Sequence, residues 1–373
     1  MSITIETYIN LALDAQENFL SYKKRSELQV SRWEFTDGKR YSPCPYWFER
    51  NQQPVGRVTE GQDETSYGKD ENGLIWVSHQ DSLINVVAYY EHLESRLIIR
   101  SYNDGKLVSI EDILYEKGRP IRYIEFNCRN GLTIENTICY EENYNYNNEA
   151  LVTIKALTYQ SNKLSVTVQY NLFYDLDGQL DRIIDQSGIL IYIYLSQYQA
   201  EMLYEEVCRE LPDAIKQVIK QIAQKTQTEK ICYLNIYATG DPYTTADAIF
   251  HPALERIRID QLNNGASLYS IWNVGNHPIR YQAGIDEKSI LNKMVMLYLH
   301  WSLQDWDWHI RAYKIWFEAI MKCNQIDWSK LIYCTDDFII VFDDGELDLP
   351  GGDLAKFVPT YKLDLLRTRA LTK

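Results

Sequence analysis

The chain has 373 residues, of which 45% are hydrophobic and 24% are charged, and its formal net charge at pH 7 is −14. This composition excludes a wholly disordered chain, because enough apolar side chains are present to bury a core. The negative charge argues against a nucleic-acid partner, which needs clustered Lys and Arg. It fits a basic protein partner, and it is equally typical of a surface that serves solubility alone. No apolar run reaches the roughly 20 residues that span a bilayer, so we expect no membrane partner.

Cysteine usage and the first residues predict a cytoplasmic protein. Seven cysteines are scattered without C-x-x-C spacing, and the start, MSITIETYIN, lacks the basic region of a signal peptide. Free thiols are typical of a reducing compartment. No cofactor is expected, since the glycine-rich dinucleotide and phosphate-loop motifs are absent from the sequence.

The N-terminal part of the chain predicts a helix followed by hairpins. Within the first thirty residues, apolar side chains such as Ile5 and Ile9 recur near helical spacing. From about residue 84 to residue 195, short β-rich runs alternate with polar turns. Asp104-Gly105 and Asp177-Gly178 are typical of hairpin turns, because their residues tolerate positive φ. The simplest architecture is an antiparallel meander with one face covered.

In each of these runs a tyrosine precedes a polar turn that contains Gly or Asn. The tyrosines in this position are Tyr102, Tyr115, Tyr144, Tyr159 and Tyr174. The pattern resembles the tyrosine–aspartate (YD, or Rhs) repeats of bacterial toxin shells, although the spacing varies and Asn, Glu or Gln often replaces the Asp. The resemblance is limited to this segment, and it implies a sheet of successive hairpins.

The rest of the chain mixes helices and strands. A helix is expected directly after the meander, with a break and a fresh start at Pro212. Two more helices are expected near 286–300 and 303–323, and strands lie before and after them. Because strands and helices do not alternate regularly, we predict an α+β fold. Its domains are residues 1–195, an N-terminal helix with an antiparallel β meander, and residues 196–373, a mixed α+β domain.

The stretch HWSLQDWDWH, residues 300–309, combines two histidines, two aspartates and three tryptophans. Ser302 and Asp305 match the spacing of a capping box, so a helix is predicted to begin at Ser302. Trp301 and Trp306 are then placed to form a hydrophobic staple. The helix is apolar over more than half of its circumference, which predicts that it is largely buried.

An alternative interpretation of the same stretch is an acid–base or metal site. Asp305 and His309 lie one helical turn apart and would form a catalytic pair. With His300 they would supply three metal ligands. The structural interpretation is favoured, because His300 lies across the helix break and no H-E-x-x-H motif exists.

The C-terminal part of the chain also resembles a family. W-S-x-x-D-W at a helix start, then an amphipathic helix and an acidic T-D-D-F strand, is similar to an uncharacterised bacterial family. Members of that family are often encoded near polymorphic toxins or among immunity proteins. The matching residues are Trp301, Ser302, Asp305, Trp306, Thr335, Asp336, Asp337 and Phe338. The resemblance points to an immunity-associated role, and it implies no particular activity, because none is established for the family.

The segment CYEENYNYNNE, residues 139–149, alternates tyrosines with carboxylates and is expected to be a surface hairpin. Its predicted partner-binding residues are Tyr140, Glu141, Glu142, Tyr144 and Tyr146. Aromatic anchors supply contact area, and carboxylates meet a basic partner. The favoured function is an acidic, non-enzymatic protein-binding module, in particular an immunity protein that neutralises a basic toxin. The alternatives are a metal-dependent hydrolase and a structural module of a larger assembly.

Overall fold

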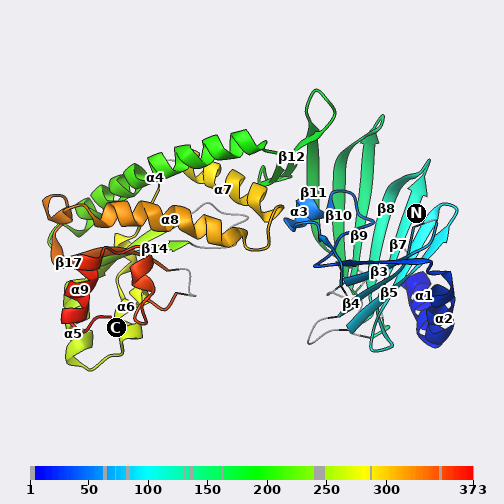
Figure 1. Cartoon of the computed structure of the whole chain (residues 1–373), viewed down its shortest axis with the longest axis horizontal. Helices are drawn as coiled ribbons and strands as arrows, with labels where there is room; N and C mark the ends of the chain where they lie inside the picture. The colour runs from blue at the N-terminus through cyan, green and yellow to red at the C-terminus, as the bar shows by residue number, and fades with distance from the viewer. Residues whose placement is uncertain are drawn as a thin grey trace. The chain divides into compact units, whose positions relative to one another are not determined.

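The chain forms two compact units, Met1–Tyr192 (unit 1) and Ile193–Lys373 (unit 2) (Figure 1). The division lies close to the boundary that the sequence predicts after residue 195. The computed structural model describes residues 5–61, 65–71, 73–80, 85–129, 131–133, 138–161, 163–238, 248–285, 288–343 and 347–372. The fold is α+β, with a large antiparallel sheet in unit 1 and a small mixed sheet in unit 2.

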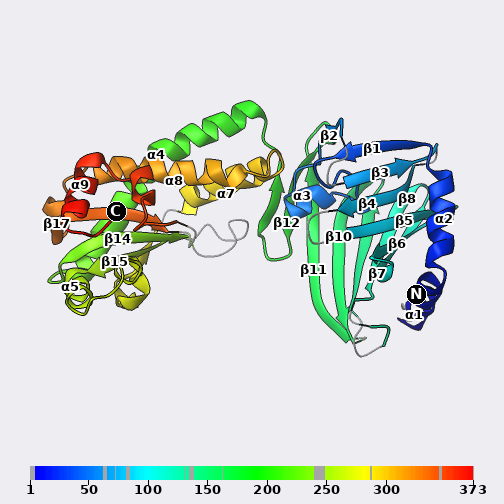
Figure 2. The same ribbon diagram turned by 60° about the horizontal axis from the view of Figure 1, so that its bottom comes forward.

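Unit 1 is built on a 13-stranded sheet in which, from β3 onward, every strand pairs with the next strand of the chain (Figure 2). Its helices are α1 (Ile5–Glu17), α2 (Phe19–Gln29) and α3 (Trp47–Asn51). Its strands, counted over the described residues, are β1 (Arg32–Thr36), β2 (Val58–Thr59), β3 (Thr65–Lys69), β4 (Leu74–Gln80), β5 (Asn85–Leu93), β6 (Arg96–Asn103), β7 (Lys106–Glu116), β8 (Arg119–Asn127), β9 (Ile138–Asn147), β10 (Ala150–Gln160), β11 (Lys163–Tyr174), β12 (Leu180–Asp185) and β13 (Leu190–Ile193). The sheet is therefore the antiparallel meander that the sequence predicts.

The predicted hairpin turns are present. Between β6 and β7, Asp104 and Gly105 have φ of 49° and 76°, as a tight two-residue turn requires. The loop after β11 is longer, and Gly178 alone supplies the positive φ. There the carboxylate of Asp175 accepts the backbone N–H groups of Asp177 and Gln179, at 2.9 and 2.8 Å. A side chain thus adds to the backbone hydrogen bonds of this turn, in which the N–H of Asp175 donates to Gln179 and the N–H of Gly178 donates to Asp175.

Both faces of the sheet are covered, whereas the sequence predicted one covered face. On one face, Tyr8 and Ala12 of α1 pack with Ile110 and Phe126 in a continuous apolar cluster. On the other face, the segment 37–56, which contains α3, packs its apolar side chains on the sheet. A sheet that is covered twice can place side chains of both alternating sets in its interior.

The carboxylate of Glu142 connects this covering segment to the sheet. Arg50 of α3 donates to both of its oxygens, at 2.6 and 2.9 Å. The hydroxyls of Tyr140 and Tyr144 donate to the same two oxygens. The side chains of Arg50 and Glu142 are only 4% and 3% exposed. A buried charge of this kind is tolerated only when it is paired and hydrogen-bonded.

The prediction that residues 139–149 form a surface hairpin is therefore wrong for residues 140–144, whereas residues 147–149 at the turn between β9 and β10 are exposed. Glu141, on the opposite face of β9, is 6% exposed and accepts from Arg122 at 2.8 Å. Tyr144 is also 6% exposed, and the half-buried Tyr146 donates to the carbonyl of Pro120. Carboxylates lie in this interior because arginines from other segments neutralise them. The side chains that were predicted to meet a partner contact the protein itself.

Unit 2 contains a four-stranded sheet in the order β16-β15-β14-β17, with β14 and β17 parallel. Its strands are β14 (Ile231–Ala238), β15 (Ala248–Leu254), β16 (Ala283–Gly284) and β17 (Cys334–Asp343). Its helices are α4 (Gln197–Thr226), α5 (Glu255–Asn263), α6 (Leu268–Trp272), α7 (Lys288–Ser302), α8 (Trp308–Asn324) and α9 (Thr360–Thr368), with 3-10 turns η2 (Val274–Asn276), η3 (Ile279–Tyr281), η4 (Trp328–Lys330) and η5 (Asp353–Lys356). In the described part of the chain, no helix has the length and apolar character needed to cross a membrane.

Helix α4 runs through Pro212 without the predicted break. Proline has no N–H, so the carbonyl of Cys208, one turn earlier, loses its helical donor. Lys322 of α8 lies 3.4 Å from that carbonyl and donates to it. The break is avoided because a neighbouring helix satisfies the orphaned acceptor.

The outer edge of β17 is bonded to side chains. Asn324 accepts the N–H of Ile340 at 2.8 Å and donates to the same residue's carbonyl at 2.9 Å. The ammonium of Lys362 donates to the carbonyl of Phe338 at 2.7 Å. These contacts satisfy backbone groups that a further strand would otherwise bind.

Replacing Arg50 with alanine is expected to lower the free energy of unfolding of unit 1 by about 3–5 kcal/mol, because Glu142 is left buried without a counter-charge. Urea unfolding of the full chain, followed by circular dichroism, measures this loss. Arg182→Ala is the matched control, since Arg182 pairs with Asp181 at the surface and is 46% exposed. Its expected cost is about 0.5 kcal/mol or less. Equal losses in the two variants would contradict the role given to Arg50.

Candidate functional site

Residues 300–309 join α7 to α8 and do not form the predicted capping box. Ser302 is the last residue of α7, is fully buried, and donates its hydroxyl to the carbonyl of Leu299 at 3.0 Å. Helix α7 extends this far because Trp301 packs into the core, where it is 8% exposed. The predicted staple is also wrong, because Trp306 is 47% exposed. Helix α8 begins at Trp308 instead.

The structure does not gather His300, Asp305 and His309 into one site. His300 lies 2.8 Å from the amide nitrogen of Gln304, and burial lowers its pKa. Asp305 faces Arg311 at 3.7 Å, and His309 is exposed. Over the described ranges, no three His, Cys, Asp or Glu side chains are placed to hold a metal ion. His300 and Asp305 are linked only indirectly, because Gln304 contacts His300 and Arg311, and Arg311 faces Asp305.

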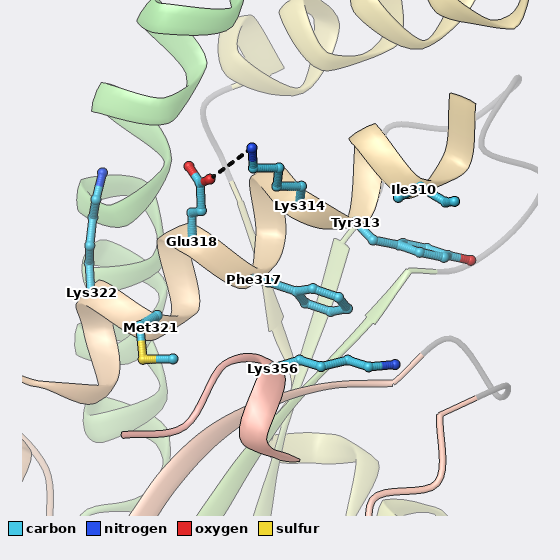
Figure 3. A pocket seen from close by; sticks show the side chains of 8 residues that line it. All are labelled: Ile310, Tyr313, Lys314, Phe317, Glu318, Met321, Lys322 and Lys356. Carbon is cyan, nitrogen blue, oxygen red and sulfur yellow. Dashed lines mark ion pairs between the residues drawn. The ribbon is translucent and has the colours of Figure 1, made fainter. Parts of the chain in front are cut away.

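A groove of about 790 Å³ follows the open side of α8 (Figure 3). Seven of its lining residues belong to α8 and one belongs to η5. They are Ile310, Tyr313, Lys314, Phe317, Glu318, Met321, Lys322 and Lys356. The exposed surface of the groove is mainly apolar. We refer to it as the α8 groove.

The floor of the α8 groove is a stripe of apolar side chains. Ile310, Tyr313, Phe317 and Met321 follow one another at intervals of three and four residues, so they lie along one line of the helix. The rings of Tyr313 and Phe317 stack with centroids 6.1 Å apart, and Phe317 packs on Phe357 at 5.3 Å. Core side chains thus support the floor from behind.

The rim of the α8 groove is mainly cationic. On one side, Lys314, Glu318 and Lys322 succeed one another along α8, and Lys356 of η5 lies on the other side (Figure 3). Lys314 pairs with Glu318 at a long 3.8 Å, and Lys356 pairs with Asp353 at 2.9 Å. Three lysines against two carboxylates, Glu318 and Asp353, leave a local excess of one positive charge in an acidic protein.

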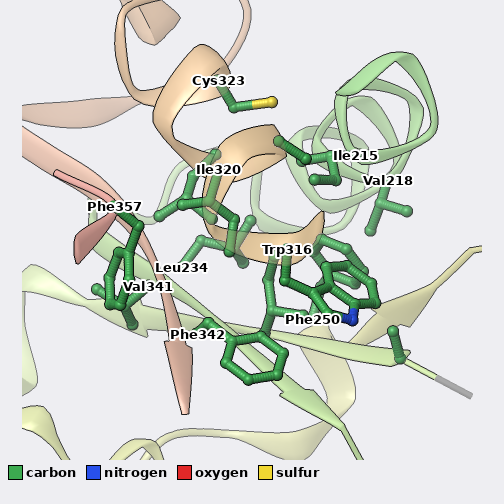
Figure 4. Close-up of a cluster of buried hydrophobic side chains, with 14 of the residues drawn as sticks. Ile215, Val218, Leu234, Phe250, Trp316, Ile320, Cys323, Val341, Phe342 and Phe357 are labelled. Carbon is green, nitrogen blue, oxygen red and sulfur yellow. The ribbon is translucent and has the colours of Figure 1, made fainter. Parts of the chain in front are cut away.

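The groove exists because α8 has more apolar surface than the core uses. Its other side packs on α4 and on the sheet, and Figure 4 shows Trp316 and Ile320 within this core. The prediction that α8 is largely buried is therefore only half right, since Ile310 is 59% exposed. The only signal in the sequence is the wide apolar arc, and an arc alone does not say which part is covered.

Unit 2 has a second cavity, of about 370 Å³, between the ends of β14 and β15 and the turn η2. The lining residues are Asn235, Tyr237, Ile249, His251, Asn273, Val274, Gly275 and Gln282. Two buried histidines lie in this region, and sequence reasoning singled out neither of them. Nδ1 of His251 is 3.0 Å from the amide nitrogen of Gln282, and Nδ1 of His277 accepts the N–H of Leu254 at 2.9 Å. Both rings accept a hydrogen bond, which requires the neutral form.

Acidification is expected to destabilise unit 2 through His277. Burial, with His251 and Arg256 nearby, lowers the pKa of His277 from 6.5 to about 4. Because the unfolded chain binds a proton at His277 more readily than the folded chain does, the contribution of neutral His277 to the stability of unit 2 is complete above pH 6.5. It falls as the pH drops toward 4, by about 3 kcal/mol at 1.36 kcal/mol per pKa unit.

The measurement is the melting temperature of the chain and of His277→Gln between pH 7 and pH 4. The variant should lose part of the pH dependence, and the remainder is expected to come from His251, whose pKa burial also lowers. His309→Gln is the control, because that side chain is exposed and should leave the profile unchanged. An unchanged profile in His277→Gln would show that another group titrates.

Comparison with known proteins supplies no relative for this architecture. No protein-family model matches the chain, and neither a curated protein nor a solved structure matches it. The resemblances to the YD repeats and to the immunity-associated family therefore stay predictions. The function of the α8 groove has to be argued from its geometry.

Proposed function

We propose that the protein is a non-enzymatic protein-binding module, and the α8 groove is the observation that carries the proposal. Apolar side chains that remain exposed along a groove are typical of protein interfaces. Aromatic residues packed from behind, such as Phe317, make effective anchors because little side-chain entropy is lost when they bind. A catalytic or cofactor pocket would enclose most of a small ligand, whereas this groove is open along its length.

The proposed partner is a basic protein. In its most specific form, the proposal is that this partner is a toxin that the chain neutralises. Support comes from the net charge of −14, to which both units contribute an excess of acidic residues. Unit 1 has 28 Asp and Glu against 19 Lys and Arg, and unit 2 has 24 against 19. Net charge attracts an oppositely charged partner over a Debye length of about 8 Å at physiological salt and raises its association rate.

A cytoplasmic location is part of the same proposal. All seven cysteines are free thiols, and five of them are buried, which suits a reducing compartment. The alternative of a metal-dependent hydrolase gains no support, because over the described residues His300, Asp305 and His309 are not placed to hold a metal ion. No observation favours the third alternative, a structural module of a larger assembly.

Ile310→Glu is expected to weaken partner binding at least tenfold, because it places a charge in the apolar floor of the groove. The tagged chain and the variant are used as parallel baits in an extract of the host at low and at high salt. The eluates are compared by mass spectrometry, and the affinity of the retained protein is then measured by calorimetry. The wild-type chain should retain a basic protein that high salt depletes.

Ile259→Glu is the matched control. Ile259 lies on α5, outside the groove, and is 46% exposed, compared with 59% for Ile310. Both variants exchange an exposed isoleucine for a carboxylate, so their folding should be equally unaffected. If Ile310→Glu retains the partner as well as Ile259→Glu does, the groove is not the binding site.

A further inference from the structure

We infer that the α8 groove binds an amphipathic helix of the partner, with an apolar face on the floor and carboxylates along both edges. The inference rests on the proposed function and names the segment that this site recognises. It follows from two properties of the groove: the lack of backbone partners in its floor and the sign of the charges on its rim.

The floor favours a helix over an extended segment. The backbone groups of α8 are bonded within the helix, so the stripe from Ile310 to Met321 offers side chains alone. An extended segment in this groove would lose water from its own N–H and C=O groups and gain no partner for them. A helix satisfies these groups internally and presents side chains three and four residues apart, as the floor does.

The length of the floor fixes the size of the bound helix. Ile310 and Met321 are eleven positions apart, which at 1.5 Å per residue is roughly 16 Å along α8, or about three turns. A partner helix lying along α8 would therefore contribute three or four apolar side chains at helical spacing. The supported rings of Tyr313 and Phe317 would be its central contacts.

The rim favours carboxylates on that helix. Lys314 and Lys322 are eight positions apart, roughly 12 Å along the helix, and Lys356 lies across the groove. Each ammonium has three donors, so the contacts that Lys314 makes with Glu318 and Lys322 with a backbone carbonyl leave donors available. A lysine-bearing helix would face like charges on both sides, and like charges across an interface oppose binding.

An acidic helix and a basic partner are compatible. The net charge of the chain acts on the whole partner before contact, whereas the three rim lysines act on the segment that enters the groove. The partner would thus be basic overall and would carry its carboxylates on one exposed helix. Such a pattern of charge would distinguish it from other basic proteins.

The test uses synthetic, fluorescein-labelled helices of about 16 residues, slightly more than four turns. One carries leucines on one face and glutamates on its flanks, a second has lysines in place of the glutamates, and a third has alanines in place of the leucines. Fluorescence anisotropy with the full-length chain measures their affinities at physiological salt. The glutamate helix is expected to bind at least tenfold more tightly than either of the others.

A charge reversal at one rim lysine then tests whether the rim contacts the bound helix. Lys314→Glu should weaken the glutamate helix about three- to tenfold and strengthen the lysine helix, because Lys314 is 67% exposed on the rim. Lys330→Glu is the matched control: it makes the same change of charge at a residue that is 81% exposed outside the groove. It should leave both affinities unchanged.

Equal binding of the glutamate and lysine helices, binding of neither, or equal effects of the two lysine variants would each overturn the inference. The proposed function would survive these results if the host partner still distinguishes Ile310→Glu from Ile259→Glu. If the host partner does not distinguish them, the proposed function fails whatever the synthetic helices do.

Discussion

A carboxylate in the middle of the large sheet has to be neutralised by a residue from outside the sheet, and the second covered face of unit 1 depends on this constraint. Glu142 cannot be covered by apolar side chains alone, because leaving a charge in their midst costs several kcal/mol. Arg50 supplies the counter-charge from α3. The residues that bracket α3, Tyr46 and Gln52, both have a φ of 53°, which is unfavourable for residues other than glycine. The ion pair and the apolar packing of this segment hold the backbone in that conformation.

Helix α8 serves the core and the surface at the same time. Trp316 and Ile320 fix the helix against the sheet, while the neighbouring line of side chains stays open. Because Phe317 also packs on Phe342 and Phe357, the floor of the groove is in contact with the core itself. A binding surface supported in this way is formed before the partner arrives, so little ordering is left for the binding step.

The fold class could be predicted from the sequence, because its signals are local. The alternation of apolar residues and turns such as Asp104-Gly105 depend on neighbours within a few positions, and so does the helical spacing near the N-terminus. What could not be predicted depends on residues that are distant in the chain. Glu142 is buried because Arg50, 92 positions away, reaches it. Pro212 remains inside α4 because Lys322, which lies 114 positions after Cys208, donates to the carbonyl that the proline leaves free.

The candidate site shows the same limit. The stretch 300–309 is unusual in composition, but the burial of Trp301 decides where α7 ends, so the predicted capping box does not form. The α8 groove follows directly after it, and the apolar arc of that helix was visible in the sequence. Which part of the arc would stay open depends on where α4, the sheet and η5 lie, and no local pattern contains that information.

The edge of β17 limits how unit 2 can associate. Asn324 binds both backbone groups of Ile340, as the backbone of a neighbouring strand would, and Lys362 takes a further carbonyl. A similar arrangement occurs in unit 1, where Gln186 binds the carbonyl of Thr167 and the N–H of Gln169 beyond the end of β12. The middle of β17 and the part of β11 that extends past β12 therefore have backbone groups that are already bonded, which hinders the addition of a further strand there, the route by which exposed strands polymerise into fibrils.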